Sequence, residues 1–395
     1  MADWSSEVAI IGAGPAGAHL ASRLAAGGRK VVLFDPKGAW EKPCGGGVPT
    51  RALREFAFIL ESADYPRKLI HRITLISHKG RRVTVRMKRP FAVYSRQVFN
   101  GLILDRALEA GAEFARAAVT DFARQGDGWE ITTSDNRRLR ARFLVGADGA
   151  ASFTRRRLVG IFPTGDLALA FGYNVATPEQ ATGDRPEDEV IVRFPKDFTG
   201  YLWAFPRPGV MNFGVASKLG EKTSDELRRL LADFMSDYYG GQMPDPERMT
   251  FFGAKIPTLE FSSWADLQTT GEQWALIGDA AGFADPITGE GIYYALKSAD
   301  LLADAFQQQA GDYRRVTSDY EQKWREAFGR DLEHASYRLP QFYHSYFFGH
   351  LFPDAVVLLS RYHKGVRTVL TRALVGEQSY VTLKRDLLRR VWQFF

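Results

Sequence analysis

A glycine-rich turn near the start of the chain constrains the fold more than any other feature. The run Gly12-Ala13-Gly14-Pro15-Ala16-Gly17 fits the pattern G-x-G-x-x-G. It stands between an apolar strand predicted over residues 7–11 and a helix predicted over residues 18–26, and a second buried strand is predicted over residues 30–34. In such a βαβ unit, the glycines let the backbone approach a pyrophosphate at the helix N-terminus. The turn therefore predicts a nucleotide site, although a tight turn without a ligand is the alternative.

An acidic residue supports the nucleotide interpretation. Asp35 ends the second predicted strand, 21 residues after Gly14, where a carboxylate can accept a hydrogen bond from a ribose hydroxyl. We expect the residues that contact the nucleotide here to be Gly12, Gly14, Ala16, Gly17 and Asp35. The turn alone does not distinguish NAD from FAD.

A later segment favours FAD. A short strand over residues 274–277 precedes Gly278-Asp279-Ala280-Ala281-Gly282, and a helix is predicted from Gly289 to Gln308. The Asp279 carboxylate can hold ribityl hydroxyls. The helix directs its positive end at the ligand, and a reduced flavin carries negative charge near its pyrimidine ring. We expect further cofactor contacts from Asp279, Pro286, Gly289, Gly291 and Ile292.

Together these segments resemble the FAD-dependent oxidoreductases of the glutathione-reductase and aromatic-hydroxylase type. The resemblance covers residues 7–160 and 270–310 and includes a Gly-Asp segment within residues 143–152. It implies that Asp148 contacts the cofactor and that Arg96 reaches the FAD phosphates or ribityl chain. Without the resemblance, Asp148 would be part of a strand-end turn and Arg96 a solvated surface residue.

The order of the predicted elements indicates an α/β fold, α+β overall. Nucleotide-binding elements at residues 1–70, 90–165 and 270–310 predict a discontinuous Rossmann-type FAD-binding domain. We expect an inserted antiparallel β-sheet domain that binds the substrate, at residues 71–89 and 166–269. Residues 311–395 are predicted to form a C-terminal helical region, and the length of 395 residues suits this division.

The segment Lys42-Pro43-Cys44-Gly45-Gly46-Gly47 holds the single cysteine of the chain. Three glycines make a bare loop that can pass close to a flat ring, although a flexible turn with an incidental cysteine is the alternative. The segment resembles the Pro-Cys-Gly-Gly motif of the geranylgeranyl reductase family. The resemblance implies that Cys44, Gly45 and Gly46 contact the flavin.

A second segment resembles the same family. In Gly200-Tyr201-Leu202-Trp203-Ala204-Phe205-Pro206, the three aromatic residues recur at period two and so share one face of a strand. Such a face can line a cavity, or it can pack on the core of its own sheet. The segment resembles the family's Tyr-x-Trp-x-Phe-Pro motif, which implies that it lines the substrate cavity. The family's following Gly-x-Gly is here Gly214-Val215-Ala216, so only Gly214 of that pair is present. The resemblance thus implies substrate contacts from Tyr201, Trp203, Phe205, Pro206 and Gly214.

The family resemblance runs over about the whole chain and implies a reaction. Members saturate isolated carbon–carbon double bonds of prenyl chains by hydride transfer from reduced flavin N5, followed by protonation. We expect Cys44 or Tyr201 to be the catalytic proton source. No second G-x-G-x-x-G follows a strand, so NADPH or a ferredoxin would reduce the flavin without a nucleotide-binding domain of its own.

The net charge of +6 is concentrated at the C-terminal end, where residues 311–395 hold 14 lysines and arginines against 9 acidic residues. The sequence lacks the dense basic stripe that is typical of nucleic-acid-binding proteins. Instead, the last predicted helix is amphipathic and basic, which favours peripheral membrane contact, with packing on the body as the alternative. Its apolar residues are Leu383, Leu387, Leu388, Val391, Trp392, Phe394 and Phe395, and its basic residues are Lys384, Arg385, Arg389 and Arg390.

One cysteine excludes a disulfide framework and a thiolate zinc site and fits a reducing compartment. We expect no metal, because the histidines of the C-terminal region lack ligand spacing. Residues 1–7 carry no basic residue, and no uncharged apolar run reaches 18 residues, so we expect neither a signal peptide nor a spanning helix. The sequence therefore predicts a cytoplasmic protein that can associate with a membrane.

Two other functions remain open. A flavin-dependent monooxygenase or halogenase shares the scaffold, but halogenases carry a Gly-Glu-Ser-type loop where this chain has residues 44–47. They also need a catalytic lysine, and nothing around Lys68 or Lys79 marks either one. The other alternative is a non-catalytic, FAD-bound lipid-binding protein.

Overall fold

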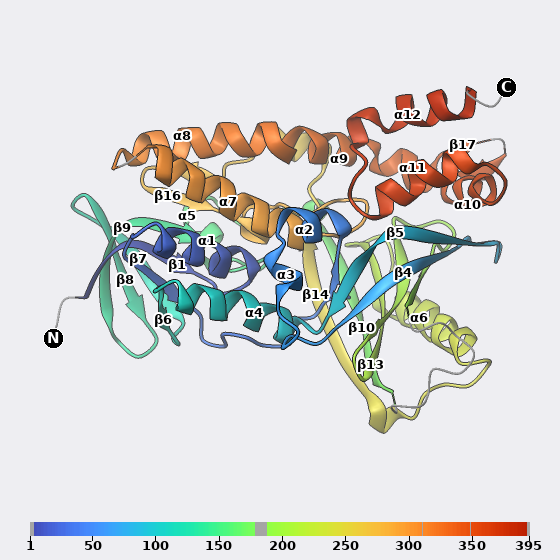
Figure 1. Cartoon of the computed structure of the whole chain (residues 1–395), viewed down its shortest axis with the longest axis horizontal. Helices are drawn as coiled ribbons and strands as arrows, with labels where there is room; N and C mark the ends of the chain where they lie inside the picture. The colour runs from blue at the N-terminus through green and yellow to red at the C-terminus, as the bar shows by residue number, and fades with distance from the viewer. Residues whose placement is uncertain (1–3, 178–187, 310, 348, 393–395) are drawn as a thin grey trace.

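The computed structural model describes residues 4–177, 188–309, 311–347 and 349–392. Within them, the strands form two large sheets and a two-stranded ribbon, and helices flank both large sheets (Figure 1). The mixed α/β fold predicted from the sequence is confirmed. The predicted domain boundaries remain a prediction.

The first sheet carries the predicted nucleotide-binding unit. Its main path runs β15-β16-β9-β1-β2-β6, with parallel pairing from β16 to β6, and the β7–β8 hairpin joins it through β9. Helix α1 packs against α4 and α7 beside this sheet. The bounds are β1 (Trp4–Ile11), α1 (Pro15–Ala26), β2 (Val31–Phe34), α4 (Arg96–Glu109), β6 (Glu113–Ala115), β7 (Val119–Gln125), β8 (Gly128–Thr133), β9 (Arg138–Gly146), β15 (Thr270–Gly271), β16 (Trp274–Leu276) and α7 (Ile292–Gln308).

The second sheet has the order β14-β10-β13-β12-β11-β4-β5-β3. Its pairing is antiparallel, as predicted, except that β11 and β4 pair in parallel. A parallel pair needs a long connection, and the chain between β4 and β11 is long enough to provide one. The bounds are β3 (Gly47–Val48), β4 (Arg67–Ile76), β5 (Arg82–Tyr94), β10 (Leu167–Ala176), β11 (Glu189–Arg193), β12 (Gly200–Arg207), β13 (Val210–Lys218) and β14 (Met249–Pro257).

The two faces of the second sheet have different partners. Leu202 and Ala204 of β12 pack in a cluster with helix α6 (Ser224–Tyr238). The alternate residues of β12, including Trp203 and Phe205, face the opposite way. Near β4 and β5 this opposite face is covered by α10 (Phe352–Tyr362) and α11 (Lys364–Leu374).

The helix predicted from Gly289 begins three residues later. Helix α7 starts at Ile292, with Gly291 as its N-cap, because Gly289 has a φ of +68° that an α-helix does not accommodate. Residues 285–290 instead form a closed loop, in which the Asp285 N–H donates to the Glu290 carbonyl at 2.8 Å.

The C-terminal region is helical, with α8 (Tyr313–Trp324), α9 (Arg330–His344), α10, α11 and α12 (Tyr380–Trp392). Helix α12 packs against α9 and α11, so Leu383 and Leu387 are half-buried, while Leu388 is exposed. Phe394 and Phe395 lie outside the described residues. In the described part of the chain, no helix is long and apolar enough to cross a membrane.

Candidate functional site

The glycine turn combines close backbone packing with open space. A Cβ at Gly12 would lie 2.4 Å from the Ala147 carbonyl oxygen, and one at Gly17 would lie 1.9 Å from the Gly12 carbonyl oxygen. Both positions therefore require glycine. A Cβ at Gly14 would meet nothing within 4 Å, so the backbone there borders open space at the N-terminus of α1.

Asp35 holds this turn in place. Its carboxylate accepts hydrogen bonds from the N–H groups of Ala13 at 3.0 Å, Lys37 at 2.8 Å and Gly38 at 2.9 Å. Helix α1 has no side-chain cap and no acidic residue in its first turn. Its N-terminal N–H groups and positive dipole end therefore face the open space beside Gly14, which suits a pyrophosphate.

The loop after β2 is clamped between two parts of the fold. Glu41 caps α4, because its carboxylate accepts from Ser95 Oγ at 2.5 Å and from the N–H groups of Arg96 and Gln97 at 3.2 and 3.1 Å. Arg207, at the end of β12, donates to Glu41 at 2.7 Å and to the carbonyl oxygens of Cys44 and Gly45. The buried guanidinium thus ties the cysteine loop to the second sheet.

The two segments that carry the family resemblance meet at this clamp. A Cβ at Gly45 would lie 3.0 Å from Phe205 Cδ2 and 3.3 Å from Trp203 Nε1. The rings of Tyr201 and Trp203 are 5.9 Å apart, and those of Trp203 and Phe205 are 6.4 Å apart. The three rings form a continuous aromatic face beneath the glycine loop.

Gly214 acts on this face indirectly. A Cβ there would lie 2.0 Å from Trp203 Cζ2, so the glycine makes room for the indole. The indole N–H donates to Asn212 Oδ1 at 2.7 Å, so the one polar group of this buried ring already has a partner. Pro206 is buried and falls on the opposite face of β12.

The Cys44 thiol lies in a positive environment. Burial raises its pKa, but nearby Arg96, the Gly46 N–H at 3.3 Å from Sγ, and Arg207 together lower the pKa below that of an ordinary thiol. Arg96 is itself buried, and its Nε has no hydrogen-bond partner in the described part of the chain. A buried N–H group without a partner is well placed to donate a hydrogen bond to an oxygen of a bound ligand.

Asp279 contacts the segment that leads into the cysteine loop. Lys42 Nζ donates to its carboxylate at 3.0 Å. A Cβ at Gly291 would lie 3.0 Å from Asp279 Oδ1, so the carboxylate sits at the N-terminus of α7. The ion pair of Lys42 and Asp279 therefore ties the cysteine loop to the N-terminus of α7.

Three tyrosines hold the loop that leads into α7. Tyr201 from β12 donates to the Thr288 carbonyl, Tyr343 from α9 to the Ile287 carbonyl at 2.9 Å, and Tyr380 from α12 to Asp285 Oδ2 at 2.7 Å. Burial raises the pKa of Tyr201 well above its usual range. The loop is thus fixed between the second sheet and the C-terminal helices.

A cavity lies between this loop and the second sheet. Its lining includes the predicted residues Tyr201, Pro286 and Gly289. Strands β10, β12, β13 and β14 supply the other wall, and Tyr343 closes one side. The cavity therefore adjoins the aromatic face.

Asp148 is placed differently from the other predicted cofactor residues. Its carboxylate accepts from Ser152 Oγ, from the Thr154 N–H at 2.9 Å and from Thr154 Oγ1 at 3.1 Å. These bonds close its own strand-end turn, and Ser152 in turn caps the short helix α5 (Phe153–Leu158).

Sequence reasoning missed Glu41, Lys42 and Arg207. Signals for them existed, because Glu41 and Lys42 directly precede Pro43 and Cys44, and Arg207 continues the period-two face of Tyr201, Trp203 and Phe205. No group of His, Cys, Asp or Glu that could hold a metal occurs among the described residues.

The remaining geometry fits a dinucleotide with a flavin ring. The uncapped α1 N-terminus suits its pyrophosphate, Asp35 lies where a ribose would pass, and Arg96 offers a buried donor. Cys44–Gly46 and the start of α7 flank the place where a flat ring would reach the aromatic face.

Comparisons with known proteins place the chain among FAD-binding proteins. The FAD binding domain family matches residues 5–202. A geranylgeranyl diphosphate reductase of Rhodobacter capsulatus is 30% identical over 311 residues, covering 75% of this chain and 73% of the relative. A geranylgeranyl diphosphate reductase of Synechocystis is 25% identical over 350 residues, covering 82% and 81%.

Two solved structures share the fold over almost the whole chain. A geranylgeranyl bacteriochlorophyll reductase-like protein of Thermoplasma acidophilum has a TM-score of 0.76 at 20% identity and covers 98% of this chain and 96% of its own. The flavin-dependent brominase Bmp2 has a TM-score of 0.73 at 17% identity, with coverage of 98% and 100%. At these identities the likeness concerns the fold alone.

The open space beside Gly14 gives a direct test of the nucleotide site. Gly14→Ala should leave the fold intact, since its Cβ meets no protein atom, but should weaken FAD binding about tenfold or more by obstructing the pyrophosphate. Fluorescence titration of flavin-free protein with FAD measures this. Gly253→Ala, in β14, is the matched control. Equal FAD affinity in Gly14→Ala and the control would contradict the assignment.

Glu290 gives a pH-dependent test of the α7 loop. Its carboxylate accepts from the Tyr293 N–H at 2.7 Å, and burial, with help from Asp285, raises its pKa from an ordinary 4.5 to about 8. A raised pKa in the folded state means that this group's stabilisation is complete below pH 4.5 and is lost as the pH rises to about 8. The slope approaches about 1.4 kcal/mol per pH unit for one proton.

Glu290→Gln keeps the hydrogen bond to Tyr293 and removes the titration. Urea unfolding of both proteins between pH 5 and 8 should show the wild type losing stability more steeply than the variant. Parallel pH profiles would show that Glu290 is ionised in the folded protein throughout this range.

Proposed function

Since the chain belongs to the geranylgeranyl reductase family of FAD-dependent oxidoreductases, we propose that it saturates carbon–carbon double bonds of a prenyl chain. The observation that carries the proposal is the contact between the Cys44–Gly47 loop and the face of Trp203 and Phe205. The contact brings together the Cys44 thiol, a glycine loop that a flat cofactor ring could approach, and the apolar aromatic face.

The cofactor of this proposal is FAD, which when bound and reduced supplies a hydride from flavin N5. The chain's own part is to hold it. The α1 N-terminus and Arg96 would hold its phosphates, and the Asp279 carboxylate would hold its ribityl hydroxyls. NADPH or a ferredoxin is the proposed external reductant.

An isolated alkene develops no oxyanion for the protein to stabilise, so binding must supply orientation and dryness. The aromatic face suits both needs. The Trp203 N–H is already bonded to Asn212, and the Tyr201 hydroxyl to the Thr288 carbonyl, so the surface offered to a prenyl chain is apolar.

Protonation of the second carbon requires an acid, and Cys44 suits this role better than Tyr201. Arg96 and Arg207 stabilise the thiolate that remains after the proton has left. Tyr201 is the weaker acid, because burial raises its pKa and Asp285, Cys44 and Glu290 would oppose its negative charge. We therefore assign proton donation to the Cys44 thiol.

A single turnover tests the function. The protein is reduced chemically without oxygen and mixed with a geranylgeranyl lipid, and the product is read by mass spectrometry. We expect a gain of hydrogen pairs and concurrent reoxidation of the flavin. Product that forms only with oxygen, and contains an oxygen atom, would assign the chain to the monooxygenases. Absence of any product, with or without oxygen, would leave the prenyl substrate without support and contradict the proposal.

Cys44→Ala tests the acid. General acid catalysis contributes about 10²–10⁴-fold, so flavin reoxidation by the prenyl substrate should slow by about 10² or more. Tyr201→Phe is the matched control and should slow the step less than tenfold. FAD affinity is measured in both variants to separate binding from chemistry. Wild-type reoxidation in Cys44→Ala would remove the thiol from the mechanism.

A further inference from the structure

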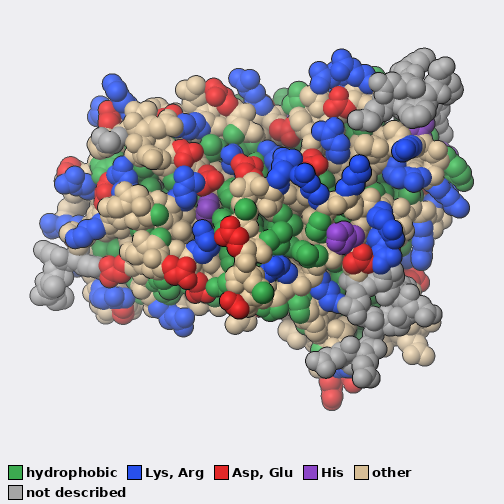
Figure 2. All heavy atoms as spheres, in the orientation of Figure 1, with side chains coloured by type: hydrophobic (Ala, Val, Ile, Leu, Met, Phe, Trp, Pro, Cys, Tyr) green, Lys and Arg blue, Asp and Glu red, His purple; other side chains and the backbone are tan. Residues whose placement is uncertain are grey.

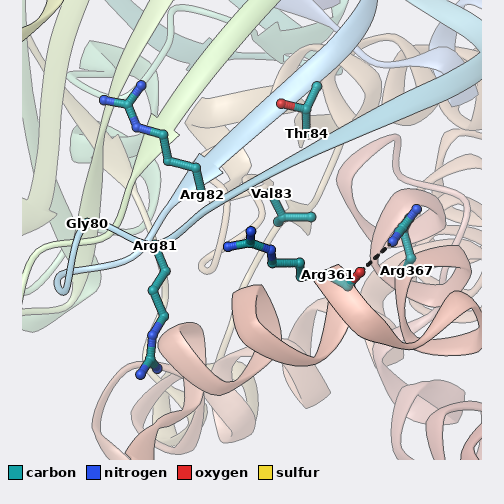
Figure 3. Close-up of a pocket in the computed structure, with 7 residues that line it drawn as sticks. All are labelled: Gly80, Arg81, Arg82, Val83, Thr84, Arg361 and Arg367. Carbon is teal, nitrogen blue, oxygen red and sulfur yellow. Dashed lines mark hydrogen bonds between the residues drawn. The ribbon is translucent and has the colours of Figure 1, made fainter.

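A basic groove lies between the β4–β5 hairpin and the helices α10 and α11 (Figure 3). It has a volume of about 540 Å³ and shares no residue with the flavin site. Its lining is Gly80, Arg81, Arg82, Val83, Thr84, Arg361 and Arg367. Four arginines therefore come together from three separate parts of the chain.

Within the described residues, one of these arginines has a carboxylate partner. Arg81 Nη1 pairs at 3.0 Å with Asp354, whose side chain is fully buried. Among the described residues, no carboxylate oxygen lies within 4 Å of the guanidinium nitrogens of Arg82, Arg361 or Arg367. The groove thus gathers three positive charges without a counter-charge from the described protein.

Arg367 is held in a fixed orientation. Its Nε and Nη2 donate to the carbonyl oxygens of Ser360 and Arg361, both at 2.8 Å, and Figure 3 shows one of these bonds. Backbone carbonyls position the guanidinium without neutralising it, and Nη1 has no hydrogen-bond partner among the described residues, so it can donate to another acceptor. An oriented arginine of this kind matches the oxygens of a phosphate.

The surroundings extend the positive field. Figure 2 shows lysine and arginine side chains gathered over the region of the C-terminal helices, with few acidic ones between them.

Val83, in the floor of the groove, belongs to the apolar cluster that also contains Val357 of α10. Tyr362 is 75% exposed beside Arg361, whose guanidinium lies 5.7 Å from the tyrosine ring.

Charged side chains also protect open strand edges, and in the described part of the chain residues 82–86 of β5 pair with β4 and with no other strand. That role explains charge on the strand itself. It does not explain why Arg361 and Arg367, from two helices, line the same groove as Arg81 and Arg82. An anionic ligand explains both.

We propose that this groove is a binding site for a group with two or more phosphate charges, either a soluble diphosphate or a phosphate head group on a lipid surface. The proposal rests on the arginine cluster and not on the proposed reaction, so either can fail alone.

The test uses the FAD-loaded protein, so that the cofactor's own phosphate site is filled. Arg82→Gln/Arg361→Gln removes two groove charges from side chains for which the structure gives no hydrogen bond within the described residues. Arg140→Gln/Arg314→Gln, on the exposed surfaces of β9 and α8, is the charge-matched control. One arm titrates inorganic pyrophosphate by calorimetry, and the other sediments vesicles of phosphatidic acid in phosphatidylcholine.

We expect the wild type and the control to bind at least one probe, and the groove variant to bind it about tenfold or more weakly. Loss of pyrophosphate binding alone identifies a soluble diphosphate, and loss of vesicle binding identifies a lipid head group. Binding of neither probe by the wild type, or equal binding by the groove variant and the control, would overturn the proposal and leave the arginines a role at the strand edge.

Discussion

The buried guanidinium of Arg207 is the contact on which the rest of the candidate site depends. It reaches across 163 residues of sequence to the Cys44 carbonyl, and it also bonds to Gly45 and Glu41. A cation this deeply buried needs partners, because burial lowers its pKa and favours the uncharged form. Glu41 supplies the opposite charge and at the same time caps α4, so one ion pair fixes a loop, a helix and a strand relative to one another.

The second organising element is the loop before α7. Three tyrosine hydroxyls from β12, α9 and α12 converge on residues 285–288. Because two of them come from the C-terminal helices, that region is part of the architecture of the site and not an appended tail. A change in the packing of α12 would reach the loop before α7 through Tyr380 and Asp285.

Local pattern made much of this site predictable. The glycine turn, Asp35, the cysteine loop and the aromatic strand each have a signature within a few residues, because backbone geometry at a tight turn or along one strand face limits which residues fit. The contacts that join these segments could not be predicted from such local signatures. The ion pair of Glu41 and Arg207 and the contact of Lys42 with Asp279 link positions far apart in sequence, and a single sequence gives no signal for such pairs. Two finer details also depended on geometry: the start of α7 moved to Ile292 because Gly289 has positive φ, and the Asp148 carboxylate closes its own turn.

The central claim is that Arg96 and, with a smaller effect, Arg207 place Cys44 in a positive environment beside the aromatic face. The pH dependence of thiol alkylation by iodoacetamide in flavin-free protein tests it most directly, since Cys44 is the only cysteine. The account predicts a wild-type thiol pKa below that of an ordinary thiol and a higher pKa in Arg207→Gln. Lys42→Gln, which removes a charge from the same loop, should leave the thiol pKa unchanged. An unchanged thiol pKa in a folded Arg207→Gln protein would contradict the account.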